Sequence, residues 1–315
     1  MLADAMFAQG VNLLIYHGTP YNPIGSDTIE FFATTYFGPN GSVTPELPAL
    51  NQYVEKVSGI MQRGKTYTDV AVYLPYEDGV MQGAYPEEKQ RVWVWGAYEM
   101  RYIYPPDETE GYHPLWINRH FLEQAQYLHH KLIVGDAQFS ALYVDVKYMD
   151  IRALKKVLQF AQQGLPVCLK QIPTQPGKNI SPEYDRMLNK LTALKNVSAD
   201  FKKVVSHAPL LQGENLPEYW CRVAADGTMY LFIAQPLSKN LTYPLYSGQS
   251  FMQQPEYRDI TINVKGKSIQ QKITFYPYQS VMLKISKEGE VEKEDITFIP
   301  KDPVVRPKEP QKTYF

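Results

Sequence analysis

The period of the apolar positions changes along the chain, and residues 1–43 form a short first section. The apolar positions between Leu2 and Gln9 fit one helix, and a nearly continuous apolar run follows from Val11 to Tyr16. A short run that is apolar on both faces is typical of a strand buried in a parallel sheet. One helix and one strand cannot form a core alone. We therefore expect this section to end a larger domain that begins upstream, to pack onto the next section and to leave an apolar face exposed.

Residues 44–210 alternate between the helical and the strand period. Helices are predicted from a Thr44-Pro45 start, from Phe121 to Leu128, and over 151–163 and 181–194. The predicted strands are 69–74, 131–134, 141–146 and 166–170. The Pro- and aromatic-rich stretch 79–114 has no regular period. Strands that alternate with helices of this length predict right-handed βαβ units and a doubly wound parallel sheet.

Residues 211–299 contain strand patterns that follow one another without helices. The expected strands are 219–223, 229–234, 259–264, 271–275 and 280–285. Turn signals at Asp226-Gly227 and Lys265-Gly266 separate members of this set. This section is predicted to be an antiparallel β-sandwich. Residues 300–315, rich in Pro and Lys, are expected to form an extended tail.

Composition narrows the classes of function. The net charge is -1 and no basic stripe is visible, which argues against a nucleic-acid partner. No run of about 18 apolar residues predicts a membrane span, and the start lacks the basic region of a signal peptide. Two cysteines exclude a disulfide scaffold. The 24 tyrosines suit stacking on sugars, although tyrosine also simply fills the faces of sheets.

Candidate chemistry is sparse. The chain has no phosphate-binding loop, no dinucleotide fingerprint, no nucleophile elbow and no histidine pair with zinc spacing. His17 follows the apolar run, and ligands of α/β sheets and barrels bind at the carboxyl ends of strands. His17, with Tyr16 and Tyr21, is therefore the predicted substrate-binding group, and a structural histidine is the alternative. Adjacent Glu77 and Asp78 are expected to cap a helix or turn rather than to act as an acid and base pair.

Several segments, taken in order, resemble glycoside hydrolase family 106, the bacterial α-L-rhamnosidases. They are 8–18 (AQGVNLLIYHG), 20–21 (PY), 32–33 (FA), 37–40 (FGPN), 47–51 (LPALN), 53–54 (YV), 69–75 (DVAVYLP), 143–145 (YVD) and 277–281 (PYQSV). The resemblance extends over most of the chain, and the order of the segments is more specific than any single one. The chain departs from the family at 24–30, where members carry a Trp-rich stretch, so the sugar stays open.

The resemblance implies an architecture for the carboxy-terminal part of a longer enzyme. It implies the remnant of a (β/α)₈ barrel in 1–43, an amidotransferase-like α/β domain in 44–210 and a β-sandwich in 211–299. The family cleaves with inversion of configuration through two carboxylates that lie upstream of the match. No catalytic residue and no metal ligand is therefore assigned here, and the chain alone is expected to be inactive.

The resemblance also implies calcium in the full-length enzyme and a periplasmic or secreted location for it. His17 corresponds to the strand-end histidine of the family. Two other functions stay open: a non-catalytic module that binds a carbohydrate, and a structural module that mediates contacts between copies in a homo-oligomer.

Overall fold

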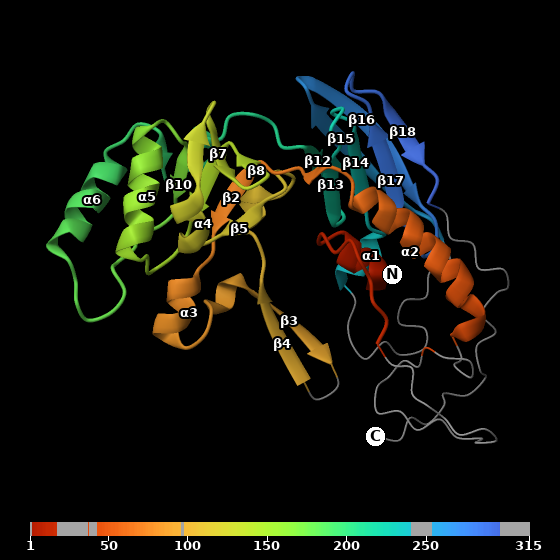
Figure 1. Cartoon of the computed structure of the whole chain (residues 1–315), viewed down its shortest axis with the longest axis horizontal. Helices are drawn as coiled ribbons and strands as arrows, with labels where there is room; N and C mark the ends of the chain where they lie inside the picture. The colour runs from red at the N-terminus through yellow and green to blue at the C-terminus, as the bar shows by residue number, and fades with distance from the viewer. Residues whose placement is uncertain (1, 18–36, 38–42, 96–97, 241–253, 297–315) are drawn as a thin grey trace.

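The structure is a computed structural model, and it describes residues 2–17, 37, 43–95, 98–240 and 254–296. Two units lie side by side, one around a parallel sheet and the other around antiparallel sheets (Figure 1). This arrangement confirms the prediction of an α/β part and an all-β part. Residues 47–66, which were expected in the α/β part, instead belong to the antiparallel unit. The expected tail at 300–315 lies outside the described residues.

The first unit is built on a five-stranded parallel sheet in the order β11-β10-β9-β2-β5. Its strands are β2 (Val70–Tyr73), β5 (Leu115–Ile117), β9 (Ala141–Val144), β10 (Val167–Leu169) and β11 (Val197–Ser198). Along the chain, the next strand of this sheet after β2 is β5, which lies on one side of β2. The one after that is β9, which lies on the other side. The chain therefore reverses its direction of winding between β2 and β9, and this is the topological switch point of a doubly wound sheet.

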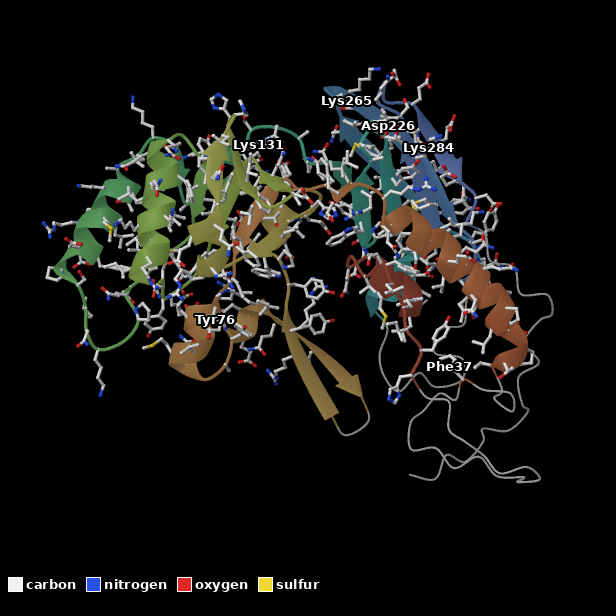
Figure 2. All side chains as sticks on the ribbon, viewed as in Figure 1. Phe37, Tyr76, Lys131, Asp226, Lys265 and Lys284 are labelled. Atoms are coloured by element: carbon white, nitrogen blue, oxygen red, sulfur yellow. The ribbon has the colours of Figure 1, made fainter. Side chains whose placement is uncertain are left out.

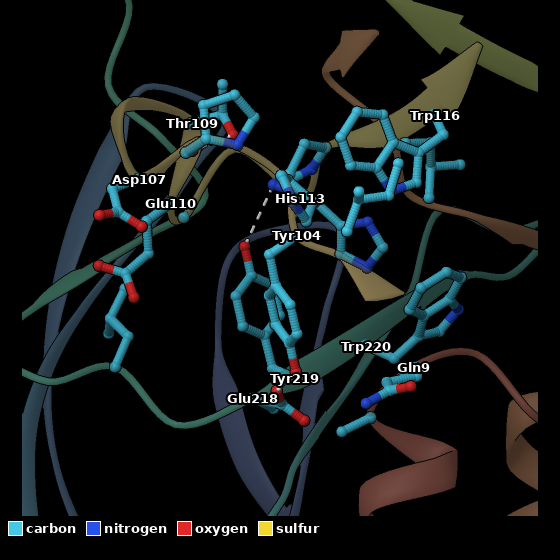
Figure 3. Close-up of a pocket in the computed structure, with 18 of the residues that line it drawn as sticks. Gln9, Tyr104, Asp107, Thr109, Glu110, His113, Trp116, Glu218, Tyr219 and Trp220 are labelled. Atoms are coloured by element: carbon cyan, nitrogen blue, oxygen red, sulfur yellow. Dashed lines mark hydrogen bonds between the residues drawn. The ribbon is translucent and has the colours of Figure 1, made fainter. Parts of the chain in front are cut away.

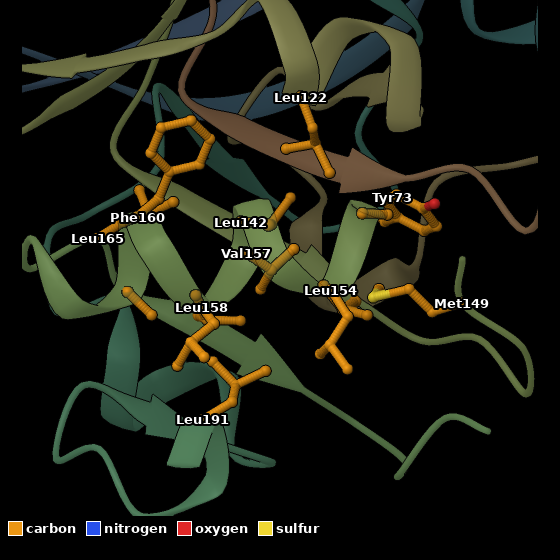
Figure 4. Packing of buried hydrophobic residues seen from close by; sticks show 14 of the residues in the cluster. Tyr73, Leu122, Leu142, Met149, Leu154, Val157, Leu158, Phe160, Leu165 and Leu191 are labelled. Carbon is orange, nitrogen blue, oxygen red and sulfur yellow. The ribbon is translucent and has the colours of Figure 1, made fainter. Parts of the chain in front are cut away.

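Both faces of this sheet are covered, which explains why its strands are apolar throughout. Ala71 and Leu142 face a large cluster formed with α5 (Ile151–Gln162) and α6 (Pro182–Thr192) (Figure 4). The alternate residues Val72 and Tyr143 face a smaller cluster near α7 (Phe201–Val204). Successive side chains of a strand point to opposite faces, so burial on both sides requires apolar residues at every position.

Helix α5 follows from its sequence alone. Asp150 caps it by accepting a hydrogen bond from the backbone N–H of Arg152 at 2.7 Å. Leu154, Val157 and Leu158 recur at helical spacing and are buried against the sheet. The predicted helices at 151–163 and 181–194 are thus confirmed, within a residue or two at their ends.

Other local predictions are corrected. The helix expected to reach Leu128 stops early, as α4 (Arg119–Gln124). It is followed by an antiparallel meander of β6 (Gln126–Leu128), β7 (Lys131–Val134) and β8 (Ala137–Phe139). His129 and His130 both have positive φ, 51° and 59°, and form the two-residue turn between β6 and β7. Such a turn matches the twist of a hairpin, and it overrides the helical spacing.

The stretch 79–114, which showed no period, contains a hairpin. Strands β3 (Gln90–Trp95) and β4 (Tyr98–Ile103) pair in antiparallel register and project away from the body (Figure 1). Short helical segments precede and follow it: α3 (Tyr76–Gln82), η2 (Glu87–Lys89) and η3 (Asp107–Thr109). The hairpin was missed because residues 92–95 (VWVW) are apolar at every position, which hides the strand period of two.

The second unit consists of two antiparallel sheets. The five-stranded sheet has β1 (Lys65–Thr66), β13 (Tyr219–Val223), β14 (Met229–Ile233), β17 (Val281–Ile285) and β18 (Val291–Glu294). The three-stranded sheet has β12 (Leu211–Gly213), β15 (Glu256–Val264) and β16 (Lys267–Phe275). Residues of both sheets, such as Leu231 and Ile262, share one apolar cluster. Figure 2 shows Asp226 and Lys265 at the two turns predicted from the sequence.

The first section packs differently from the prediction. Helices α1 (Leu2–Phe7) and α2 (Leu47–Met61), the second preceded by η1 (Thr44–Glu46), lie on the outer face of the five-stranded sheet (Figure 1). Phe7 meets Phe232 there with ring centroids 5.8 Å apart. The first section was expected on the parallel-sheet unit, but within the described residues its apolar face instead covers the antiparallel sheet.

The strand expected at 11–16 is also wrong. Residues 11–17 have no regular secondary structure, and Leu13 and Ile15 are 62% and 84% exposed among the described residues. This segment runs beside α2, where the Gln62 side chain donates to the Asn12 carbonyl oxygen at 2.8 Å. An apolar run forms a buried strand only where neighbouring strands pair with it, and none does so in the described part of the chain.

Leu154→Ala tests the large cluster. Leu154 is fully buried, so the truncation removes apolar contacts and leaves a cavity, and we expect a loss of about 2–5 kcal/mol in the free energy of unfolding. Urea denaturation measures this loss. Lys155→Ala on the exposed side of the same helix is the control, with an expected change within about 0.5 kcal/mol. Equal effects of the two variants would contradict the assignment of the buried face.

Candidate functional site

The two units are joined by the loop between η3 and β5. Gly111 has a φ of +83°, and a Cβ built on it would lie 2.0 Å from the carbonyl oxygen of Leu211. The backbone N–H of Leu211 donates to the carbonyl oxygen of Gly111 at 3.2 Å. Only glycine permits both this left-handed conformation and so close an approach. The loop that enters the edge strand of the parallel sheet thus lies directly against β12 of the antiparallel unit.

His113, two residues further, inserts its ring into the antiparallel unit. The backbone N–H of Cys221 donates to Nε2 of His113 at 3.2 Å, and the backbone N–H of His113 donates to the Tyr219 hydroxyl at 3.2 Å (Figure 3). Because Nε2 accepts, the neutral ring carries its proton on Nδ1. Nδ1 is buried and has no hydrogen-bond partner among the described residues. Burial lowers the pKa of His113 to about 4, so the ring is neutral at pH 7.

A cleft of about 390 Å³ opens beside this joint (Figure 3). Its aromatic walls come from both units and include Tyr104, Trp116, Tyr219 and Trp220. Its polar groups are supplied by the side chains of Gln9, Arg91, Asp107, Glu110 and Glu218. A mainly apolar hollow with a few polar groups at its rim is the usual form of a site for a small ligand.

Tyr104 is held in place from two sides. Its hydroxyl donates to Oε1 of Glu218 at 2.8 Å. The guanidinium carbon of Arg91 lies 3.6 Å from the centroid of its ring. Burial first, and then the neighbouring Glu218 carboxylate, raise the pKa of Tyr104 well above its ordinary value, so the phenol stays protonated. The arrangement presents a flat ring flanked by a carboxylate and a cation.

A second hollow, of about 340 Å³, lies at the carboxyl edge of the parallel sheet, at the switch point between β2 and β9. Asp145, directly after β9, is the centre of its polar network. The Lys89 ammonium lies 2.9 Å from Oδ2 of Asp145, and the Gln171 side chain donates to Oδ1 at 2.6 Å. Lys89 also donates to the carbonyl oxygen of Asp145. This hollow is where the fold rule for doubly wound sheets expects a ligand.

Glu77 and Asp78 support the loops around this edge. The Asp78 carboxylate is fully buried and accepts the backbone N–H groups of Lys147 and Tyr148 at 3.0 and 2.8 Å. Glu77 accepts a hydrogen bond from the Tyr73 hydroxyl at 2.9 Å, and burial raises its pKa. The two carboxylates thus have separate partners. Neither lines the cleft or the second hollow. Both lie inside α3 rather than at its cap, and Asp78 instead holds the loop that follows β9.

A serine, a histidine and an aspartate meet at the opposite, amino edge of the parallel sheet. Nε2 of His207 lies 2.6 Å from Oδ2 of Asp69, and the Ser140 hydroxyl donates to Oδ1 of Asp69 at 2.5 Å. The Ser140 hydroxyl lies 3.5 Å from the same nitrogen of His207. A catalytic triad needs the serine and the aspartate on different ring nitrogens. The group therefore joins the starts of β2 and β9 to the loop at His207 and is not a nucleophile relay.

Of the residues predicted to bind substrate, Tyr16 and His17 line neither hollow. Tyr16 stacks on Phe37 with ring centroids 4.6 Å apart and donates from its hydroxyl to Oδ1 of Asn51 at 3.0 Å. His17 is exposed. The argument that put His17 at the carboxyl end of a strand is wrong, because 11–17 is not a strand. Tyr21 lies outside the described residues. Their role in binding a substrate stays a prediction.

Sequence reasoning missed the residues of both hollows. The carboxyl-end rule that was applied to His17 applies equally to Asp145, which follows a correctly predicted strand. No comparable signal identifies Arg91, Trp116 or Trp220, because three separate segments of the chain bring them together.

Within the described residues, neither a metal site nor a membrane helix adds to this geometry. No group of three or more metal-ligating side chains occurs within the described residues. No helix among them has the length and apolar character to cross a membrane. The chain matches no protein-family model and no curated protein. The fold itself defines the class: a doubly wound parallel sheet joined to antiparallel sheets, with hollows at the joint and at the switch point.

The neutral His113 predicts a specific pH dependence of stability. Its folded pKa of about 4 lies below the unfolded value of 6.5, so its contribution is complete above pH 6.5 and is lost as the pH falls towards 4. The expected loss is about 3 kcal/mol, since each unit of pKa corresponds to about 1.4 kcal/mol. Urea denaturation between pH 4 and 7.5 measures it.

His113→Asn is the matched variant, because asparagine tolerates the φ of 50° found at this position and does not titrate. We expect the variant to be less stable at pH 7 but to lose less stability than the wild type on acidification. Parallel pH profiles for the two proteins would show that His113 titrates normally in the folded state.

Proposed function

We propose that this chain is the glycan-binding, carboxy-terminal part of a glycoside hydrolase similar to the inverting α-L-rhamnosidases, and that it binds sugar without cleaving it. The observation that carries the proposal is the cleft at the joint, where aromatic rings from both units surround a small set of polar groups. Aromatic faces stack on the apolar faces of sugar rings, and flanking carboxylate and guanidinium groups pair with sugar hydroxyls.

The chemistry of the rim suits a neutral sugar. A sugar hydroxyl both donates and accepts hydrogen bonds, so it is best satisfied by a donor and an acceptor side by side. Arg91 supplies donors over the ring of Tyr104, and Glu218 supplies an acceptor beside its hydroxyl. Gln9, exposed at the end of α1, offers both kinds of group. These groups are held by a rigid joint, which reduces the entropic cost of binding.

The assignment of the two units to an amidotransferase-like domain and a β-sandwich is part of the same proposal. The order of the parallel strands supports a doubly wound, amidotransferase-like domain, and the cluster shared by the two antiparallel sheets supports a β-sandwich. The barrel remnant in 1–43 rests on the resemblance alone, because the described part of this section packs as a helix on the antiparallel sheet.

Catalysis is assigned to residues outside this chain. Within the described cleft, the Glu218 carboxylate accepts a hydrogen bond from the Tyr104 hydroxyl. The carboxylate pair, the calcium and the periplasmic or secreted location are proposed for the full-length enzyme. Plant or microbial polysaccharide is the proposed source of the sugar.

Calorimetric titration with rhamnose-containing oligosaccharides tests the proposal. We expect the wild type to bind and to release no chromophore from an aryl rhamnoside. Trp220→Leu keeps apolar volume but removes a flat ring, and we expect binding to weaken roughly tenfold. Tyr276→Ala is the control, because Tyr276 is 51% exposed and does not line the cleft, and it should bind as the wild type does.

Thermal unfolding of both variants separates loss of binding from loss of folding. A flat titration with the wild-type protein would refute the glycan-binding proposal. Turnover of the aryl rhamnoside by this chain would refute the assignment of catalysis to residues elsewhere.

A further inference from the structure

We infer that the hollow at the switch point is a second sugar subsite, continuous with the cleft, so that the ligand is an oligosaccharide of at least two units. This inference rests on the proposed function, because it assigns the class of ligand for the same region. It differs in placing a binding role on Lys89 and Asp145, which line the second hollow, while Gln171 holds the Asp145 carboxylate in position.

The two hollows adjoin. They share the segment from Tyr104 to Asp107, together with Arg91 and Trp116. The shared segment forms one wall of each hollow, and Trp116 belongs to β5, the strand next to β2. Because the two hollows share these lining residues, we assign the first sugar of the glycan to the cleft and the next sugar to the second hollow.

Arg91 lines both hollows, and its guanidinium is positioned to donate hydrogen bonds to a ligand. Its guanidinium is held over the ring of Tyr104 and has no ion pair or hydrogen bond among the described residues. A guanidinium has five N–H donors in one plane. Donors at this junction suit the oxygen that links two sugar units and the hydroxyls on either side of it.

The second hollow is fixed by its own hydrogen bonds. Asp145 is held by Lys89 on one carboxylate oxygen and by Gln171 on the other. The Lys89 ammonium has three N–H donors, and each carboxylate oxygen has two lone pairs, so both keep capacity for a ligand. Donors and acceptors that are fixed before binding bind sugar hydroxyls at a low entropic cost.

Charge selects a neutral ligand. The second hollow is lined by three acidic side chains, Glu88, Asp107 and Asp145, and by two basic ones, Lys89 and Arg91. An anion such as a phosphate would be opposed by this balance, and the chain has no glycine-rich loop to hold one. A neutral oligosaccharide meets no such barrier.

The experiment is calorimetric titration of the whole chain with L-rhamnose and with neutral rhamnose-containing oligosaccharides of two, three and four units. We expect affinity to rise roughly tenfold or more from one unit to two, as a second set of hydrogen bonds forms. Lys89→Met keeps the side-chain stem but removes the donors. It should abolish most of this rise and leave the affinity for the single sugar unchanged.

Lys170→Met is the matched control. Lys170 follows the neighbouring strand at the same edge of the sheet and pairs with Glu108 at 2.6 Å, but it lines neither hollow. It should keep the full dependence on ligand length. Thermal unfolding confirms that both variants fold.

The outcomes separate the two proposals. Equal affinity of the wild type for one and for several units would overturn the second subsite and leave the cleft as the glycan site. Equal weakening of single sugar and oligosaccharide by Lys89→Met would also overturn it, since the hollows would then not be separate subsites. Absence of any binding by the wild type would overturn the proposed function itself.

Discussion

The insertion of one loop of the parallel-sheet unit into the antiparallel unit is the contact on which the rest of the structure depends. Gly111 lies against the carbonyl of Leu211 where no side chain fits, and His113 then accepts a hydrogen bond from the backbone of β13. Both residues have left-handed φ, so the loop turns sharply before it enters β5. A joint made of backbone contacts and a buried neutral ring holds the two sheets in one relation, because few alternative packings satisfy it.

That joint determines the chemistry of the surface around it. Trp116 follows the loop on β5, Trp220 lies on β13 beside Cys221, and Tyr104 precedes the loop. Their rings line one cleft only because the loop brings β5 and β13 together. The hydrogen bond from Tyr104 to Glu218 crosses the same boundary. The cleft is thus a property of the pair of units and belongs to neither alone.

The two edges of the parallel sheet have different roles for a related reason. At the carboxyl edge the chain diverges between β2 and β9, and the polar network of Asp145 borders a hollow. At the amino edge Asp69, Ser140 and His207 bond to one another and close the edge. Both edges carry side chains of catalytic type, and the hollow described above lies at the diverging edge, where ligands of doubly wound sheets bind.

The sequence by itself determined the elements whose signals are local. The apolar spacing of α5, the apolar strands β9 and β10, and the succession of antiparallel strands after Tyr219 were all predicted, because burial on one or two faces leaves a short-range period. Only the tertiary structure decided the packing of α1 and α2 on the antiparallel sheet, the exposure of Leu13 and Ile15, and the assembly of the cleft. The apolar character of a segment indicates that it can be buried. Which other segment buries it depends on contacts between residues far apart in the chain.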